Sequence, residues 1–163
     1  MEPAFSLRRQ LRPGDIGEIT RMHGEFYSQE YGYGVAFEAY VAQGLAEFQH
    51  QYNAARDRVW LYEDEGRLVA MLFLMDRGDR AQLRYFLTHP DYRGRGLGKD
   101  LMAKFMNALT ESGYTHSFLW TTDHLAVAAS LYTRNGFVLT EQKASTRFGK
   151  PLVEMKYEWW AEG

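Results

Sequence analysis

The sequence contains no cysteine among its 163 residues. That absence excludes disulfide bonds, thiolate metal sites and a cysteine nucleophile, and it is typical of a protein from a reducing compartment. The longest apolar run, residues 68–75, is much shorter than the about 20 residues that a membrane-spanning helix needs. The first ten residues also lack the apolar segment of a secretory signal. We therefore expect a cytoplasmic protein that does not insert into membranes.

An excess of positive charge is missing too. Lysine and arginine number 19 against 21 aspartate and glutamate residues, and the formal net charge is −2. Non-specific nucleic-acid binding depends on a basic surface, so this balance argues against a nucleic-acid partner. The five histidines do not have the spacing of metal ligands, and we expect no metal site.

The chain has the composition of an ordinary globular protein, with 45% hydrophobic and 25% charged residues. Its length fits a single domain over residues 1–163. Aromatic residues reach 15%, which indicates a well-filled core, an aromatic-lined pocket or a subunit interface. The C-terminal run Tyr-Glu-Trp-Trp at 157–160 is the candidate contact of a homodimer.

Hydrophobic periodicity and turn residues predict the order β-αα-βββ-α-β-α-ββ. The predicted strands cover about 5–9, 59–63, 68–75, 82–88, 116–121, 137–141 and 152–159, and the predicted helices cover about 16–26, 37–48, 97–109 and 125–135. Asp15 is placed to cap the first helix. A meander combined with crossover helices predicts a mixed α/β fold with helices on both faces of one sheet.

Glycine is concentrated at 93–99, which read Arg-Gly-Arg-Gly-Leu-Gly-Lys, between a predicted strand and a predicted helix. Glycines there let backbone N–H groups approach a ligand, and the helix start adds a positive dipole end, so the segment predicts an anion site. Two common phosphate motifs do not fit. A Walker A loop needs Ser or Thr where Asp100 stands, and the Rossmann fingerprint needs Gly-x-Gly-x-x-Gly rather than Gly-x-Gly-x-Gly.

The segment 87–98, Leu-Thr-His-Pro-Asp-Tyr-Arg-Gly-Arg-Gly-Leu-Gly, resembles the signature of the GNAT superfamily of acyl-CoA-dependent N-acetyltransferases. Arg93, Gly96 and Gly98 match its fixed positions, and the run 131–137, Leu-Tyr-Thr-Arg-Asn-Gly-Phe, is similar to a second family element. More narrowly, the chain resembles the acetyltransferase domain sometimes fused to winged-helix regulators, although we expect no winged helix within these residues. The resemblance implies a mostly antiparallel, twisted sheet of about seven strands.

The resemblance also implies acetyl-CoA as the acyl donor. The residues that it assigns to the donor are Leu87, Thr88, Arg93, Arg95, Gly96, Gly98 and Lys99. Backbone amides around 95–99 are expected to hold the diphosphate, and the backbone of Leu87 and Thr88 is expected to bond the pantetheine. The same resemblance makes the N–H group of Leu87 the oxyanion donor and Tyr132 the general acid that protonates the departing thiolate.

The sequence does not identify a single general base. Many family members place a glutamate on the strand before the loop, whereas this chain offers Gln82, which cannot titrate. Asp123 and His124, just after the next strand, are the alternatives. A second departure is Leu125, which stands where many members carry asparagine.

The acceptor site is expected at the first two helices and the loop between them, where acidic and aromatic residues gather. Glu25, Tyr27, Tyr31 and Trp120 are the predicted substrate residues, suited to a cationic amine with an apolar body. The competing interpretation of this region is a solvated helix face with tyrosines at its rim. We expect an N-acetyltransferase that acts on a primary amine of a small molecule or peptide, with a non-catalytic acyl-CoA-binding or sensing module as the alternative.

Overall fold

A computed structural model describes residues 5–162, and it contains the predicted order of elements. The helices are α1 (Asp15–Tyr31), α2 (Val35–His50), α3 (Leu97–Glu111) and α4 (Ala126–Arg134), with a short 3₁₀ turn, η1 (Pro90–Tyr92). The strands are β1 (Ser6–Arg8), β2 (Arg58–Asp64), β3 (Arg67–Asp76), β4 (Ala81–Thr88), β5 (His116–Thr122), β6 (Val138–Ser145) and β7 (Leu152–Trp160).

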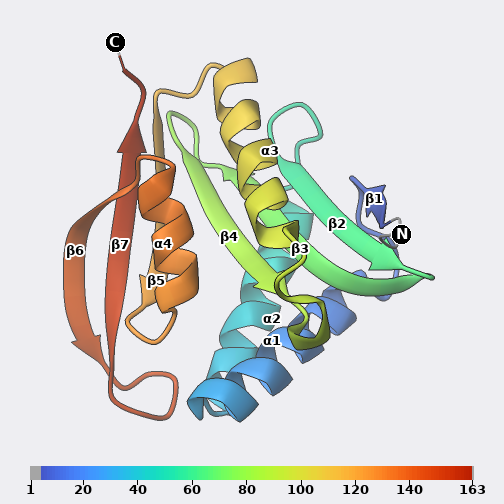
Figure 1. Ribbon diagram of the computed structural model, residues 1–163, viewed down its shortest axis with the longest axis vertical. Coiled ribbons are helices and arrows are strands. Elements are labelled where there is room, and N and C mark those ends of the chain that lie inside the picture. Colours follow the sequence, from blue (N-terminus) through green and yellow to red (C-terminus); the bar gives the residue numbers. More distant parts are fainter. Residues whose placement is uncertain (1–4, 163) are drawn as a thin grey trace.

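Over residues 5–162, all seven strands form one sheet in the order β1-β2-β3-β4-β5-β7-β6. Every neighbouring pair is antiparallel except β4 and β5, which are parallel. Helices α3 and α4 cover one face of the sheet, and α1 and α2 cover the other (Figure 1). The predicted mixed, mostly antiparallel sheet with helices on both faces is confirmed.

Strand β3 lies at the centre of the fold and is buried on both faces. Side chains alternate along a strand, so Met71 and Phe73 pack in the core beneath α1 and α2, while Leu72 and Leu74 pack in the core beneath α3. All four side chains are fully buried. This double burial explains why the strand reads as a continuous apolar run rather than as an alternating one.

Strand β4 is distorted midway, and the distortion opens the sheet. The register between β3 and β4 shifts opposite Tyr85, whose φ of +57° lies in the left-handed region. On its other side β4 pairs with β5 through only two residues, Ala81 and Gln82. A bulge bends and twists the strand that carries it, so β4 turns away from β5 beyond this point. Figure 1 shows the two strands separating toward the end of the molecule where α1 and α2 lie.

Several boundaries differ from the sequence-based prediction, and two of the differences have a clear local cause. Helix α1 begins at Asp15 itself, because Gly14, with φ +96°, takes the capping position. The Asp15 carboxylate instead accepts a hydrogen bond from the Arg12 N–H at 2.6 Å and pairs with Arg8. Strand β6 extends to Ser145 rather than ending near residue 141. It is an exposed edge strand, and its polar sequence has no apolar alternation that would show where the strand ends.

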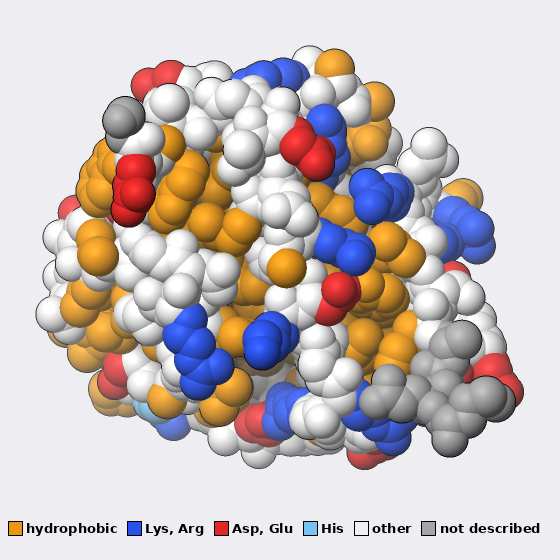
Figure 2. All heavy atoms as spheres, turned by 45° about the horizontal axis from the view of Figure 1, so that its top comes forward, with side chains coloured by type: hydrophobic (Ala, Val, Ile, Leu, Met, Phe, Trp, Pro, Cys, Tyr) orange, Lys and Arg blue, Asp and Glu red, His pale blue; other side chains and the backbone are white. Residues whose placement is uncertain are grey.

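The aromatic C-terminal run is largely internal. Tyr157 is buried, and Trp159 packs against the same core. Only Trp160 in this run is a large exposed hydrophobic residue, and its ring stacks on that of His116 at 5.2 Å. Figure 2 shows acidic and basic side chains interspersed over one face of the molecule rather than gathered by sign.

Candidate active site

A cleft of about 550 Å³ lies where the glycine loop meets the sheet. The C-terminal end of β4, the first turn of α3 and the start of α4 line it. Six of the predicted donor-binding residues lie along this cleft: Leu87, Thr88, Arg93, Gly96, Gly98 and Lys99. The two segments that carry the family resemblance, 87–98 and 131–137, therefore meet in one place, because Leu131 and Tyr132 also line the cleft.

The glycine loop forms an anion seat at the start of α3. Gly94 and Gly96 have φ values of +77° and +81°, a region that favours glycine. Gly96 occupies the N-cap and supplies no side chain to it. The N–H groups of residues 97–99 therefore lack a side-chain cap at the rim of the cleft. Together with the helix dipole, these groups favour a negatively charged ligand.

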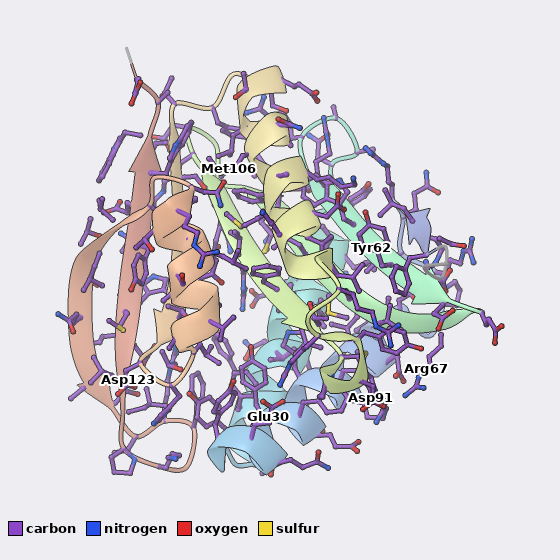
Figure 3. The ribbon with its side chains drawn as sticks, in the orientation of Figure 1. Glu30, Tyr62, Arg67, Asp91, Met106 and Asp123 are labelled. Atoms are coloured by element: carbon purple, nitrogen blue, oxygen red, sulfur yellow. The ribbon has the colours of Figure 1, made fainter. Side chains whose placement is uncertain are left out.

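The three basic residues of the loop have different environments. Arg93 lines the cleft, but it donates two hydrogen bonds to Glu30, at 2.9 and 2.6 Å, which raise its pKa. Arg95 stacks over the Tyr92 ring at 4.9 Å and is not among the residues that line the cleft. Lys99 lines the cleft and forms no ion pair with any residue in 5–162. Figure 3 shows Glu30 and Asp123 at the same end of the molecule, where β4 and β5 have separated.

The backbone register corrects the predicted oxyanion donor. The N–H of His89 donates to Val69 O at 2.7 Å, which makes that end of β4 part of the ladder with β3. Backbone groups alternate between the two sides of a strand, so the N–H of Leu87 also faces β3. The N–H groups of Phe86 and Thr88 have the opposite parity and face the cleft. The N–H of Leu87 is therefore turned away from the cleft, and we expect the neighbouring Phe86 rather than Leu87 to be the oxyanion donor.

A second, smaller cavity of about 110 Å³ adjoins the cleft. It lies between α1, α2, the bulged part of β4, β5 and the segment between β6 and β7. Four residues line both spaces: Tyr27, Phe86, Leu125 and Tyr132. The two spaces thus meet at these four side chains.

Tyr132 has the properties of a proton donor at this junction. Its side chain is buried, and its hydroxyl makes no hydrogen bond to another residue of the described chain. Burial raises the pKa of Tyr132 well above its ordinary value, and the neighbouring Tyr27 and Tyr157 act in the same direction. The phenol therefore keeps its proton at neutral pH.

The smaller cavity contains charged and titratable groups that the sequence did not predict. Arg84 lines it, and so do Arg147 and Glu154, which pair at 2.6 Å. His23 also lines it, with its Nδ1–H donating to Ile19 O at 2.9 Å. These residues come from α1, β4, β7 and a loop, so no local motif marks them. Burial, with the charge of Arg84 nearby, lowers the pKa of His23 to about 4, and the ring is neutral at pH 7.

A short chain of polar side chains connects the two spaces. The Tyr33 hydroxyl lies 2.6 Å from Thr122 Oγ1 and 3.1 Å from His124 Nδ1. Tyr33 and Thr122 line the smaller cavity, and His124 lines the cleft. Asp123, the other predicted base, instead accepts a hydrogen bond from the Val153 N–H at 2.9 Å.

The predicted substrate residues are only partly brought together. Tyr27 lines both spaces, Trp120 lines the smaller cavity and Tyr31 lines the cleft. Glu25 lines neither of these two spaces; it is exposed on α1 and pairs with Arg21 at 2.6 Å. Gln82, the residue that cannot titrate, lines the smaller cavity and accepts a hydrogen bond from Arg77 Nε.

Two further features of residues 5–162 bear on the class of site. Within this range no three histidine, aspartate or glutamate side chains are grouped as metal ligands. In the same range no helix is both long enough and apolar enough to cross a bilayer.

Comparison with known proteins relates both the sequence and the fold to one family. The Escherichia coli protein named uncharacterized N-acetyltransferase YjgM is 29% identical over 140 residues, which cover 83% of each chain. An acetyltransferase of the GNAT family from Staphylococcus aureus Mu50 has a similar fold, with a TM-score of 0.79 at 18% identity over 98% of this chain and 100% of that one. The yncA protein of Salmonella typhimurium, solved with its cofactor acetyl-CoA, has a TM-score of 0.69 at 17% identity over 98% and 95% of the two chains.

The family match covers most of the site. The model of the acetyltransferase (GNAT) family matches residues 20–137, a range that includes most of α1, the bulged strand β4, the glycine loop and Tyr132. The likeness in fold extends beyond that range to nearly the whole chain. The chain belongs to the GNAT family of acetyltransferases.

Proposed function

We propose that the protein moves an acetyl group directly from acetyl-CoA to a primary amine of a small molecule or peptide. The observation that carries the proposal is the meeting of two spaces at Tyr132, one of them rimmed by the uncapped start of α3. The proposal treats residues 1–163 as one acetyltransferase domain. Its kinship with domains fused to winged-helix regulators, and its assembly as a homodimer, stay predictions.

The cleft residues fit acetyl-CoA, the cofactor with which the yncA protein was solved. The donor would supply an acetyl group activated as a thioester. The N–H groups of residues 97–99 would hold the diphosphate, with Lys99 as the cation still free to pair with it. Arg93 is already engaged by Glu30, so we assign it to shaping the loop. The backbone of Thr88, which faces the gap beside β4, would bond the pantetheine in the manner of an added strand.

The transfer needs one bond to form and one to break. The amine nitrogen attacks the acyl carbon, and the carbon–sulfur bond breaks. The N–H of Phe86 would donate to the acyl oxygen as negative charge develops on it. The Tyr132 hydroxyl gives its proton to the departing thiolate, and the proton that the nitrogen loses as the amide forms returns to the Tyr132 phenolate. Because the chain has no cysteine, we expect no acyl-cysteine intermediate.

The proton released by the amine also needs an acceptor, because an alkylamine with a pKa near ~10 arrives protonated. Gln82 cannot take it, and the Asp123 carboxylate is engaged by Val153. We assign this role to His124, reached from the smaller cavity through Thr122 and Tyr33. The chain of contacts ends at a partly exposed ring, from which the proton passes to solvent.

The test begins with acetyl-CoA binding, measured by calorimetry, followed by release of free coenzyme A in the presence of a panel of amines. A thiol reagent reports coenzyme A alone, because the protein has no thiol of its own. We expect both binding and amine-dependent release. Binding without release by any amine would favour the acyl-CoA-sensing alternative, for which Gln82 and Leu125 are the supporting features. Absence of binding would refute both functions.

A further inference from the structure

Arg84 is held in a fixed place in the wall of the smaller cavity. Its guanidinium carbon lies 4.6 Å from the centre of the Tyr85 ring and 5.2 Å from that of Tyr40. On α2, Gly44 leaves room for it: a Cβ on that glycine would lie 2.7 Å from Arg84 Nη2. Two rings and a glycine notch therefore orient a cation that is itself half-buried.

No carboxylate balances this cation. Within residues 5–162, no aspartate or glutamate oxygen lies within 4.0 Å of Arg84, and its guanidinium makes no hydrogen bond to another side chain. Glu154 is the one acidic residue that lines the cavity, and it is already paired with Arg147. His23 adds no charge, because burial keeps it neutral. The cavity thus carries one unbalanced positive charge.

Two buried hydroxyls in the lining of the same cavity also lack partners. Tyr85 is 7% exposed and Thr121 is 8% exposed, and both line the same cavity. Neither the Tyr85 hydroxyl nor Thr121 Oγ1 has a hydrogen-bond partner in the described chain. Buried polar atoms are nearly always satisfied in a working protein, so two unpartnered hydroxyls in one cavity point to a polar ligand. The unbalanced cation in the same cavity favours a ligand with acceptor atoms.

We infer that the acceptor amine carries a carboxylate, which Arg84 binds while the amine points toward Tyr132; the acceptors are therefore amino acids rather than polyamines. This inference rests on the proposed function for its direction of binding. A guanidinium matches a carboxylate in geometry as well as in charge, and the Tyr85 hydroxyl is a further donor in the same wall. A second ammonium group would instead meet the Arg84 charge.

The inference replaces the cationic acceptor expected from the sequence. That expectation depended on acidic residues near α1, but Glu25 is paired with Arg21 and Glu30 with Arg93. Neither glutamate is among the residues of 5–162 that line the smaller cavity. The charged groups that do line it, Arg84, Arg147 and Glu154, have a net positive charge.

The test compares amines that differ by one carboxylate. Calorimetry on the protein saturated with coenzyme A would measure binding of the common amino acids, each against its decarboxylated amine, such as leucine against isoamylamine, phenylalanine against phenethylamine and lysine against cadaverine. We expect at least one amino acid to bind about 10- to 100-fold more tightly than its partner, as for a hydrogen bond between charged groups. If no amino acid in the panel binds more tightly than its decarboxylated partner, the inference is wrong.

Substitutions identify the residue responsible. Arg84→Gln should remove the preference for the carboxylate, and Arg84→Lys should retain part of it. Arg80→Gln is the matched control, because Arg80 also stacks on an aromatic ring, that of Phe118 at 4.4 Å, but lies outside the cavity. A preference that survives Arg84→Gln unchanged would overturn the assignment.

The two proposals fail in different ways. Binding selectivity is read without turnover, so carboxylate-dependent binding combined with no acetyl transfer would refute the enzymatic function alone. Faster acetylation of the decarboxylated amines would retain the enzymatic function and overturn the inference.

Discussion

The hydroxyl of Tyr33 lies 3.1 Å from Nδ1 of His124, and this contact joins the smaller cavity to the rim of the larger cleft. If the amine proton leaves along it, Tyr33→Phe and His124→Gln should each lower kcat by about 10- to 100-fold. The double variant should be no slower than the worse single one, because both changes interrupt one route. Losses that multiply in the double variant would show that the two residues act separately.

Replacing Tyr132 by phenylalanine should lower kcat by roughly 100-fold or more, since the thiolate then departs without a proton donor. The dissociation constant for acetyl-CoA, measured by calorimetry, should change little, because the ring and its packing remain. Tyr157→Phe is the control, as it removes a phenol from the neighbouring ring, 6.0 Å away, that lines neither space. Equal turnover in wild type and Tyr132→Phe would end the assignment of Tyr132 as the acid.

Gly96→Ala should weaken acetyl-CoA binding, because φ of +81° strains any other residue and the strain falls on the anion seat. Gly66→Ala in the β2–β3 turn gives a close control, with φ +78° and equally open space around the added methyl. Both variants should lose about 1–2 kcal/mol of unfolding free energy in thermal or denaturant melts. Only Gly96→Ala should raise the dissociation constant, and an equal rise in both would remove the special role of the loop.

The buried His23 should make the fold sensitive to acid. Its pKa of about 4 in the folded protein lies below the value of 6.5 expected when it is exposed, so between these values the unfolded chain binds more protons. Stability is full above pH 6.5 and falls as the pH drops toward 4, by at most roughly 1.4 kcal/mol per pH unit from this group. Melts of His23→Gln should show a weaker decline than wild type.

The exposed His50→Gln variant serves as the reference for that series. It should follow the wild-type decline, because its ring is in solvent in both states. A His23→Gln protein as acid-sensitive as wild type would show that other groups carry the whole effect.

The sequence predicted the donor side of the site better than the acceptor side. The proposed donor site consists of a contiguous glycine loop and the start of one helix, features that local sequence encodes. The acceptor cavity depends on the bulge at Tyr85, and tyrosine is not a residue that signals a positive φ. The pairing of Arg84 with Phe73 already turns Arg84 toward α1 and α2, and the bulge brings the next side chain, Tyr85, to the same face.

The choice of Leu87 rather than Phe86 from the sequence has a related cause. Apolar alternation shows which face of a sheet a side chain takes, but not which neighbouring strand its N–H group bonds. Only the hydrogen bond from His89 to Val69 fixed that choice.

Strand β4 pairs with β5 through only two of its residues, so the sheet consists of two groups of strands that this short pairing connects. Beyond Gln82, the backbone of β4 offers hydrogen-bonding groups that no strand in residues 5–162 takes up on that side. A donor with amide groups of its own would supply the missing rungs there. Binding and folding would thus use the same kind of backbone contact, and the donor would become a temporary eighth strand in a sheet of seven.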